Sequence, residues 1–371
     1  MNYLAFTTLI IIFISFFFSF FLFTVKTKNK ISNIIIASYL IVVSIEISVF
    51  FYQSYIEIPK TLDFIRDRVS LLQSPLLFIY VISMLYSDFK LKRKHLIHIV
   101  PFIIFVLPIT AIPINSYFET LIYSDRSLFF FIFFIHIQFL SYIIATFIAL
   151  HRFKKILLEN YSQANIMTYK WLLQLNILIS VVFGFAIFKN IFNIISENPE
   201  TTNLIRIIMV VLVLGFICWI ILKGLYHPQI FRGIDSNLKP IGEIISHTTT
   251  ENKEVSISLD TQHQIGLLKK YMEDKKPYLD PTLTIQNLAY QINLPSREVS
   301  ILINHHLNKH FFDLVNEYRI KRAMEILKNP DHRKLTILEI LYEVGFNSKS
   351  SFNTAFKKHT NTTPTQYRKN N

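Results

Sequence analysis

Long apolar runs dominate the first part of the chain. A helix rises 1.5 Å per residue and a bilayer core is about 30 Å thick, so about 20 apolar residues are needed to cross it. Seven stretches before residue 227 fit this requirement, and the pattern predicts a polytopic membrane bundle of about seven spans over residues 1–226. They are Tyr3–Val25, Ile31–Gln53, Val69–Ser87, Leu96–Ile114, Ser127–Leu150, Trp171–Ile195 and Leu204–Tyr226.

The pattern changes after Tyr226, where polar residues become frequent. Residues 227–261 combine Gly, Pro and a Thr-rich run, and we expect them to form a cytoplasmic linker. From Gln262 onward, short segments with helical spacing of apolar residues predict a second, all-α domain over residues 262–371. Its first segment, Gln262–Asp274, is either the first helix of that domain or a dimer contact.

A pair of short helices recurs in this second domain. "TIQNLAYQI" (284–292) precedes "SREVSILINHHL" (296–307), and "TILEILYEV" (336–344) precedes "SKSSFNTAFKKH" (348–359). Two short helices with a tight turn between them are typical of a helix-turn-helix, and Gly345 suits the second turn. Between the pairs, the amphipathic segment Phe311–Leu327 is expected to hold them at a fixed separation. The residues expected to face the core are Ile285, Leu288, Ala289, Ile292, Val299, Leu302, Ile303, Leu307, Ile337, Ile340, Leu341, Val344, Phe352, Ala355 and Phe356.

The distribution of charge predicts the orientation of the chain in the membrane and the kind of partner that it binds. The formal net charge of +13 over 371 residues favours an anionic partner, such as nucleic acid or a membrane surface. Basic loops after the first, third and fifth spans ("KTKNK", "KLKRK" and "HRFKK") predict a cytoplasmic side there, with the N-terminus outside and residues after Tyr226 inside. Lys60, Arg66 and Arg68, in the expected outer loop, weaken this pattern. The single cysteine, Cys218, excludes an internal disulfide and a Cys-based metal site.

A few polar residues interrupt the spans near their expected outer ends. Ionisable groups inside a membrane are costly and often functional, which raises the hypothesis of an outward-facing signal pocket. The alternative is that these groups pair with one another, reach the membrane surface or bond between helices. The candidate pocket residues are Glu46, His136, Gln138, Lys189 and Arg206.

The last 105 or so residues resemble the C-terminal DNA-binding domain of the AraC/XylS family of bacterial transcription regulators. The resemblance rests on "ILEILYEVGFNSKSSFNTAFKKHTNTTPTQYR" (Ile337–Arg368) and on "VSILINHHLNKHFFDLVNEYRIKRA" (Val299–Ala323). Departures from the family pattern are Leu341 in place of Ala, Asn308 and Asn361 in place of Gly, and Ser351 and Thr354 in place of Tyr and Arg.

The resemblance implies two recognition helices that read successive major grooves. The base-facing residues it implies are Arg297, Ser300, Asn304, Lys349, Ser350 and Asn353. Those it implies for phosphate contacts are Lys309, Lys357, Lys358 and Arg368. Arg319 is expected to pack within the domain instead.

These patterns together predict a membrane-bound transcription regulator that binds double-stranded DNA. The expected location is the inner membrane of a bacterium, with the DNA-binding domain in the cytoplasm. A homodimer, RNA polymerase and a small-molecule or envelope signal remain open as further partners. We see no catalytic motif and expect no enzyme activity, cofactor or metal site, although His305, His306 and His310 cluster. The alternative is a multi-span transporter or receptor whose helix-turn-helix domain is only a regulatory or protein-binding tail.

Overall fold

The computed structural model describes residues 3–26, 30–53, 55–86, 88–111, 124–162, 166–195, 198–226, 259–332 and 334–370. Every regular element within these ranges is a helix, which confirms the predicted all-α class. The chain divides into two compact units. The first comprises Met1–His151 and Met167–Ser236, and the second comprises Arg152–Ile166 and Asn237–Asn371.

Six helical segments of the described residues are long and apolar enough to cross a membrane. They are α1 (Tyr3–Thr24), α2 with α3 (Lys30–Ile47 and Val49–Tyr52), α4 with η1 and α5 (Lys60–Arg68, Val69–Leu72 and Gln73–Leu85), α8 (Asp125–Asn160), α9 (Ile166–Ile195) and α10 (Pro199–Tyr226).

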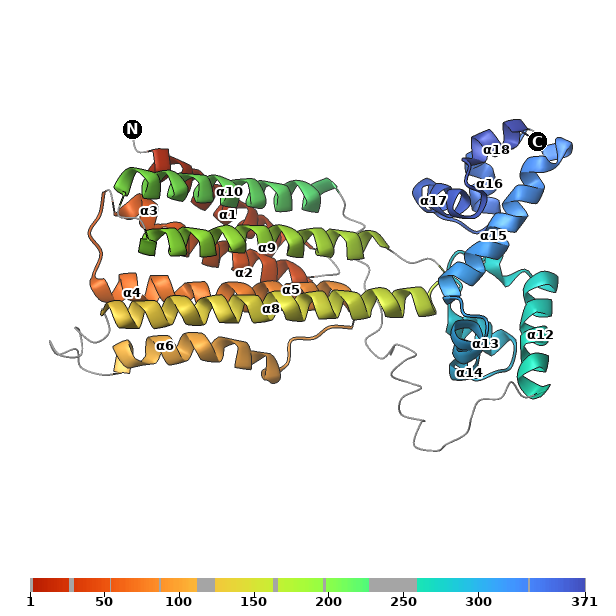
Figure 1. Cartoon of the computed structure of the whole chain (residues 1–371), viewed down its shortest axis with the longest axis horizontal. Coiled ribbons are helices and arrows are strands. Elements are labelled where there is room, and N and C mark those ends of the chain that lie inside the picture. The colour runs from red at the N-terminus through yellow and green to blue at the C-terminus, as the bar shows by residue number, and fades with distance from the viewer. Residues whose placement is uncertain are drawn as a thin grey trace. The chain divides into compact units, whose positions relative to one another are not determined.

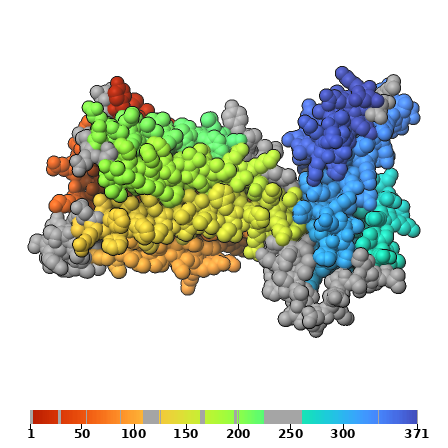
Figure 2. Space-filling view, viewed as in Figure 1, coloured from red at the N-terminus to blue at the C-terminus, as the bar shows by residue number. Residues whose placement is uncertain are grey.

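These helices form a bundle in the first unit (Figure 1). Helix α1 packs against α2 and α10, and α2 packs against α5. Stacked rings join α8 to α9 through Phe139 and Phe183, and α9 to α10 through Trp171 and Trp219, each pair 4.7 Å apart. Figure 2 shows the side chains of these three helices covering one face of the unit.

The fourth predicted span differs from the other six. Its described part is a 3₁₀ segment, η2 (Arg93–Ile99), followed by α6 (Val100–Ala111), which has 12 residues and contains Pro108. A helix of that length covers about 18 Å, less than a bilayer core. The end expected at Ile114 lies outside the described residues.

The third span begins earlier than predicted, because the expected loop residues from Lys60 onward form α4. Two basic residues that weakened the charge pattern are paired there. Arg66 bonds Asp63 at 2.8 Å, and Arg68 pairs with Asp67. The Arg68 guanidinium also lies 4.0 Å and 3.7 Å from the ring centroids of Phe64 and Phe131. Their charges are therefore balanced inside the bundle, which sequence order alone did not indicate.

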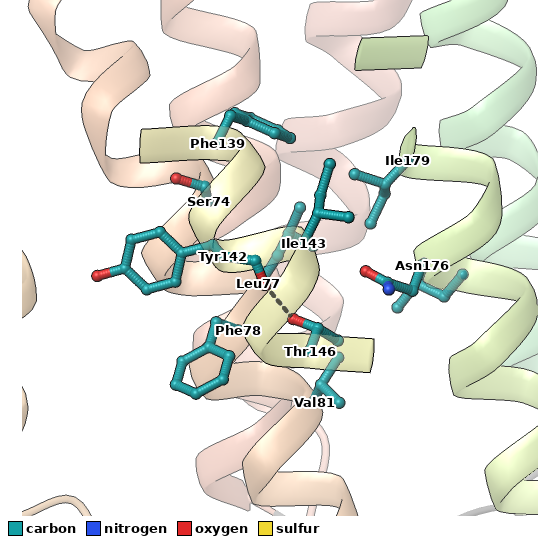
Figure 3. A pocket seen from close by; sticks show the side chains of 11 residues that line it. Ser74, Leu77, Phe78, Val81, Phe139, Tyr142, Ile143, Thr146, Asn176 and Ile179 are labelled. Carbon is teal, nitrogen blue, oxygen red and sulfur yellow. Dashed lines mark hydrogen bonds between the residues drawn. The ribbon is translucent and has the colours of Figure 1, made fainter. Parts of the chain in front are cut away.

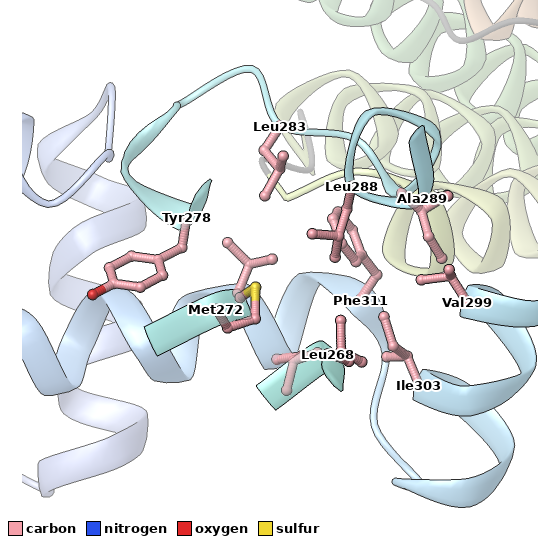
Figure 4. Packing of buried hydrophobic residues seen from close by; sticks show 12 residues of the cluster. Leu268, Met272, Tyr278, Leu283, Leu288, Ala289, Val299, Ile303 and Phe311 are labelled. Atoms are coloured by element: carbon pink, nitrogen blue, oxygen red, sulfur yellow. The ribbon is translucent and has the colours of Figure 1, made fainter. Parts of the chain in front are cut away.

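The second unit contains two small hydrophobic cores joined by one helix, α15 (Phe311–Lys328). Figure 4 shows the first core, in which Leu268 and Met272 of α12 (Leu259–Asp274) pack beside Phe311. The segment predicted from Gln262 is therefore part of a domain helix that already begins at Leu259, so residues 259–261 of the expected linker are helical. Residues 227–258 of that linker lie outside the described residues. The other elements are η4 (Pro277–Leu279), α13 (Ile285–Gln291), α14 (Ser296–Ile301), η5 (Leu302–His306), η6 (Pro330–His332), α16 (Ile337–Glu343), α17 (Lys349–Thr360) and α18 (Pro364–Asn370).

Candidate nucleic-acid interface

The first helix-turn-helix unit begins at Thr284. The Thr284 hydroxyl accepts a hydrogen bond from the Asn287 backbone N–H at 3.2 Å, which satisfies one of the free donors at the start of α13. After α13, Asn293 takes a left-handed conformation with φ 56°, and the Leu294 N–H donates to the Ala289 carbonyl at 3.0 Å. This closure turns the chain sharply into α14.

The second unit repeats this local chemistry. Thr336 and Glu339 form a reciprocal capping box at the start of α16. Gly345, with φ 90°, takes the place of Asn293, and the Phe346 N–H donates to the Leu341 carbonyl at 2.9 Å. The predicted duplication is therefore present in the backbone geometry as well as in the amino-acid sequence. Leu341, larger than the Ala of the family pattern, is fully buried in the second core.

The predicted apolar faces are largely buried. Side chains Phe352, Ala355 and Phe356 of α17 lie in the second core, as expected. In the first helix-turn-helix unit, Val299, Leu302 and Ile303 are buried, while Ile292 and Leu307 are only partly so. In the second, Ile337 is partly buried. Asn308 and Asn361, which stand in place of family glycines, both have positive φ, at 50° and 57°. Asn is the residue other than Gly that best tolerates this conformation.

The structure places the predicted base-facing residues unequally. Arg297, Lys349 and Ser350 are exposed in the first turns of α14 and α17. Asn353 is half-buried one turn further along.

Ser300 and Asn304 differ from expectation. Ser300 is only 6% exposed, so its predicted outward orientation is wrong. Asn304 turns back, and its Nδ2 donates to the Ser300 carbonyl at 2.9 Å. Both lie where α14 passes into the π-helical turn η5, whose wider winding shifts the helix faces. A base contact by either residue stays a prediction.

Two of the predicted phosphate-binding lysines are already paired with acids. Lys309 pairs with Glu317, and Lys358 Nζ lies 2.7 Å from the Asp313 carboxylate. Burial raises the pKa of Glu317, but hydrogen bonds from Lys309 and Lys321 outweigh it and leave the pKa below its usual range. Sequence reasoning missed Asp313 and Glu317, because both belong to a helix read only as a connector.

These pairs line a polar surface cavity of about 350 Å³ that also includes His310 and His359. Among the described residues, no group of His, Cys, Asp and Glu is arranged to hold a metal ion. The remaining phosphate candidates are Lys357, which is exposed, and Arg368, which is partly buried.

Arg319 is fully buried in the middle of α15, as predicted. Its Nε donates to the Tyr278 carbonyl at 2.6 Å and its Nη2 to the Asp280 carbonyl at 2.8 Å. Burial lowers the pKa of Arg319 to about 10, so it stays charged at neutral pH. Its place indicates an architectural function inside the domain.

In the membrane bundle, four of the five candidate signal residues come together. Lys189 is close enough to Glu46, Arg206 and His136 to interact with them electrostatically. The Glu46 carboxylate accepts a hydrogen bond from Gln73, and His136 lies 3.2 Å from the Asn190 amide. Gln138 is turned away, because its Nε2 donates to the Leu71 carbonyl at 3.0 Å.

A cavity between α5, α8 and α9 lies apart from these residues. It has a volume of about 20 Å³, which is room for about one water molecule, and includes none of the five candidates. Figure 3 shows its lining, in which Ser74, Tyr142, Thr146 and Asn176 carry polar side-chain atoms. The cavity is too small for a signal molecule larger than water.

Two helix-turn-helix units on one connecting helix are typical of the DNA-binding domains of transcription regulators. Comparison with known proteins supports this class, because residues 288–370 match the family described as "Helix-turn-helix domain". This part of the chain is a helix-turn-helix domain of the AraC type.

Relatives share this region. The chain is 33% identical over 89 residues to the HTH-type transcriptional regulator YdeC of Bacillus subtilis, covering 24% of this chain and 30% of that protein. It is 39% identical over 70 residues to the probable transcription factor PqrA of Proteus vulgaris, covering 18% of this chain and 57% of that protein. The chain therefore spans less than two thirds of the relatives it matches.

Among solved structures, the chain is similar to the C-terminal domain of AraT, a response regulator from Geobacillus stearothermophilus. The identity is 29%, the match covers 29% of this chain and 84% of that chain, and the TM-score is 0.26.

Proposed function

We propose that the chain is a membrane-tethered transcription regulator that binds promoter DNA through both helix-turn-helix units. The observation that carries the proposal is the duplicated unit on α15, in one chain with six helices fit to cross a membrane. Recognition helices α14 and α17 would enter successive major grooves, about 34 Å apart on one face of the duplex.

The exposed side chains of the membrane bundle support its insertion in lipid. On α1, Phe13 and Phe17 are 70% and 69% exposed, and Phe130 on α8 is 66% exposed. Large aromatic side chains in such numbers are not left against water by a folded protein. A bilayer of the bacterial inner membrane would cover them, with the second unit in the cytoplasm as the basic loops indicate.

A signal in or across the membrane would control the regulator. The cluster of Glu46, Lys189, Arg206 and His136 is the candidate receiver, because ionisable groups inside a membrane bundle are costly and therefore usually mark a functional site. Homodimerisation and contact with RNA polymerase would fit such a regulator and stay proposals.

Footprinting tests this proposal with the full chain in lipid nanodiscs and the DNA upstream of its own coding region, at a fixed salt concentration. We expect two protected windows about one helical turn apart. The double variant Arg297→Ala with Lys349→Ala should lose both windows, whereas the exposed control Lys369→Ala should keep them. Uptake of a solute into liposomes that contain the protein, with no protected DNA, would favour the transporter alternative.

A further inference from the structure

The last turn of α8 continues into a short segment, Tyr161–Ser162, which packs within the second unit. The Ser162 N–H donates to the Leu283 carbonyl at 3.1 Å. Tyr161 forms an isolated antiparallel bridge with Thr284, the residue that caps the first helix-turn-helix unit. Ser162 is completely buried. The segment that directly follows α8 therefore packs beside the residue that caps the first helix-turn-helix unit, and both belong to the second compact unit.

Ser162 also supplies acceptors to Arg319. The Arg319 Nη1 lies 3.2 Å from the Ser162 carbonyl oxygen, and its Nη2 lies 3.4 Å from the Ser162 hydroxyl. A guanidinium carries five N–H donors and no acceptor, and a buried charge is costly unless its donors are satisfied. The carbonyls of Tyr278 and Asp280 supply the other acceptors. Ser162 therefore completes the hydrogen-bonding shell of a buried cation in the DNA-binding domain.

Arg319 lies where the two helix-turn-helix units meet. These units, Thr284–His306 and Thr336–Thr360, are called the reading heads below. Its guanidinium is 5.5 Å from the ring centroid of Phe346, the residue after the turn of the second unit. At that turn, a Cβ on Gly345 would lie 2.6 Å from the Tyr278 carbonyl oxygen and 2.7 Å from that of Leu279. The backbone of η4 thus touches the second turn directly. One buried arginine connects η4, the second turn and the loop after α8.

We propose that Tyr161–Ser162 is a docking segment that fixes the spacing of the two reading heads. Displacement of this segment by a shift of α8 would be the step by which the membrane region weakens two-groove binding. Only Tyr161 separates the last residue of α8, Asn160, from Ser162, so a movement of the helix end reaches Arg319 without a flexible spacer. This regulatory step depends on the proposed function, whereas the docking contact does not.

Disulfide trapping tests the docking contact in the full chain in nanodiscs. In a Cys218→Ser background, Tyr161→Cys with Thr284→Cys places two thiols at bridged positions, where antiparallel Cα atoms are about 4.5–5.5 Å apart. Mild oxidation should cross-link this pair. The control, Tyr161→Cys with Tyr290→Cys, moves the second thiol six residues along α13 and should not cross-link. Equal cross-linking of both pairs, or of neither, would overturn the docking contact.

Footprinting of matched Ser162 variants tests the regulatory step. Ser162→Trp cannot fit the buried site, and we expect about tenfold weaker binding to two-groove DNA, from the loss of hydrogen bonds to a charged group. Binding to a single-groove half-site should not change. Ser162→Ala keeps the backbone bonds and loses only the 3.4 Å contact between the hydroxyl and Arg319, so its two-groove binding should fall far less than that of Ser162→Trp. Unchanged two-groove binding by Ser162→Trp would overturn the step.

The cross-linked protein separates misfolding from undocking. Oxidation of the Tyr161→Cys, Thr284→Cys pair should hold the segment docked and preserve two-groove binding. Reduction should allow the segment to be displaced again. If oxidation lowers two-groove binding, the docked state is not the competent one and the proposal fails. If the wild type protects no specific site, the proposed function fails, and trapping alone still decides whether the segment docks.

Discussion

Arg297 and Lys349 occupy similar places at the residue scale. Each is an exposed basic side chain in the first turn of the second helix of its unit. An arginine there can donate two parallel hydrogen bonds to a guanine edge, whereas a lysine offers only a point charge. We therefore expect the first helix-turn-helix unit to discriminate between bases more strongly than the second.

Arg297→Ala should cost about 1–3 kcal/mol of specific binding and relax the preference at one base pair. Arg297→Lys should lose most of the same discrimination, because the bidentate geometry is gone. Lys357→Ala should instead weaken binding evenly across sequences and reduce the salt dependence. Binding of the full chain to a panel of single-base operator variants measures the difference. An even loss with Arg297→Ala would show that this residue contacts only phosphate.

The acidic partners of Lys309 and Lys358 should compete with DNA phosphates. Glu317→Gln removes the carboxylate that pairs with Lys309, so we expect severalfold tighter binding to nonspecific DNA at low salt. The matched control is Glu325→Gln, which breaks the 3.0 Å pair with Arg322 on the same helix away from the cavity. Fluorescence anisotropy measures both. Equal affinities for the two variants would rule out this competition.

The same carboxylate predicts a pH dependence of stability. The pKa of folded Glu317 lies below the ordinary value of 4.5, so its ion pairs stabilise the fold above that pH and are lost as the pH falls below it. The unfolding temperature of the full chain should therefore drop in acid, and Glu317→Gln should reduce that drop. Thermal unfolding of both proteins at neutral pH and below pH 4.5 checks the sign. A larger acid drop in the variant would contradict it.

At the element scale, the two turns provide a matched pair of substitutions. Gly345 has φ 90° and no room for a Cβ beside the carbonyl oxygen of Tyr278. Gly345→Ala should therefore lower the free energy of unfolding by about 2 kcal/mol or more. Asn293→Gly, at the equivalent turn with φ 56°, should change it little. Denaturant unfolding measures both, and a mild effect of Gly345→Ala would contradict the steric constraint at the second turn.

Helix α6 determines the topology of the membrane unit. If α6 crosses the membrane with the six longer segments, the N-terminus lies outside while the DNA-binding domain lies inside. We expect a reporter fused before Tyr3 to score as external, and one inserted after Leu91 to score as cytoplasmic. An internal N-terminus would leave six spans and place α6 at the membrane surface.

The helices of the second unit show what local sequence can predict. The residues of α17 were predictable, because Phe352, Ala355 and Phe356 repeat at helical spacing and Ser348 caps the start. The burial of Ser300 was not, because the passage from α14 into a π-helical turn has no clear local signature. The early start of the third span at Lys60 was missed for a similar reason. Its charges are balanced by Asp63, Asp67 and aromatic rings, and that balance exists only after folding.

At the scale of the whole molecule, the sequence predicts the parts better than their connection. Long apolar runs and repeated short helices separate a membrane region from a DNA-binding domain with no structure in hand. The contact between Ser162 and Arg319 joins residues 157 positions apart and involves a backbone carbonyl, which carries no sequence signal. The candidate signal residues were gathered only in part, since Gln138 bonds the backbone of another helix instead.

In the proposed function, DNA is bound by a chain that remains in the membrane. The most direct measurement is to cross-link living cells, isolate the membranes, and sequence the DNA that co-purifies with the full-length chain. We expect enrichment of a few promoter sites in the membrane fraction, and loss of this enrichment in the Arg297→Ala, Lys349→Ala double variant. DNA recovered without site preference, or only with a shorter soluble fragment, would contradict it.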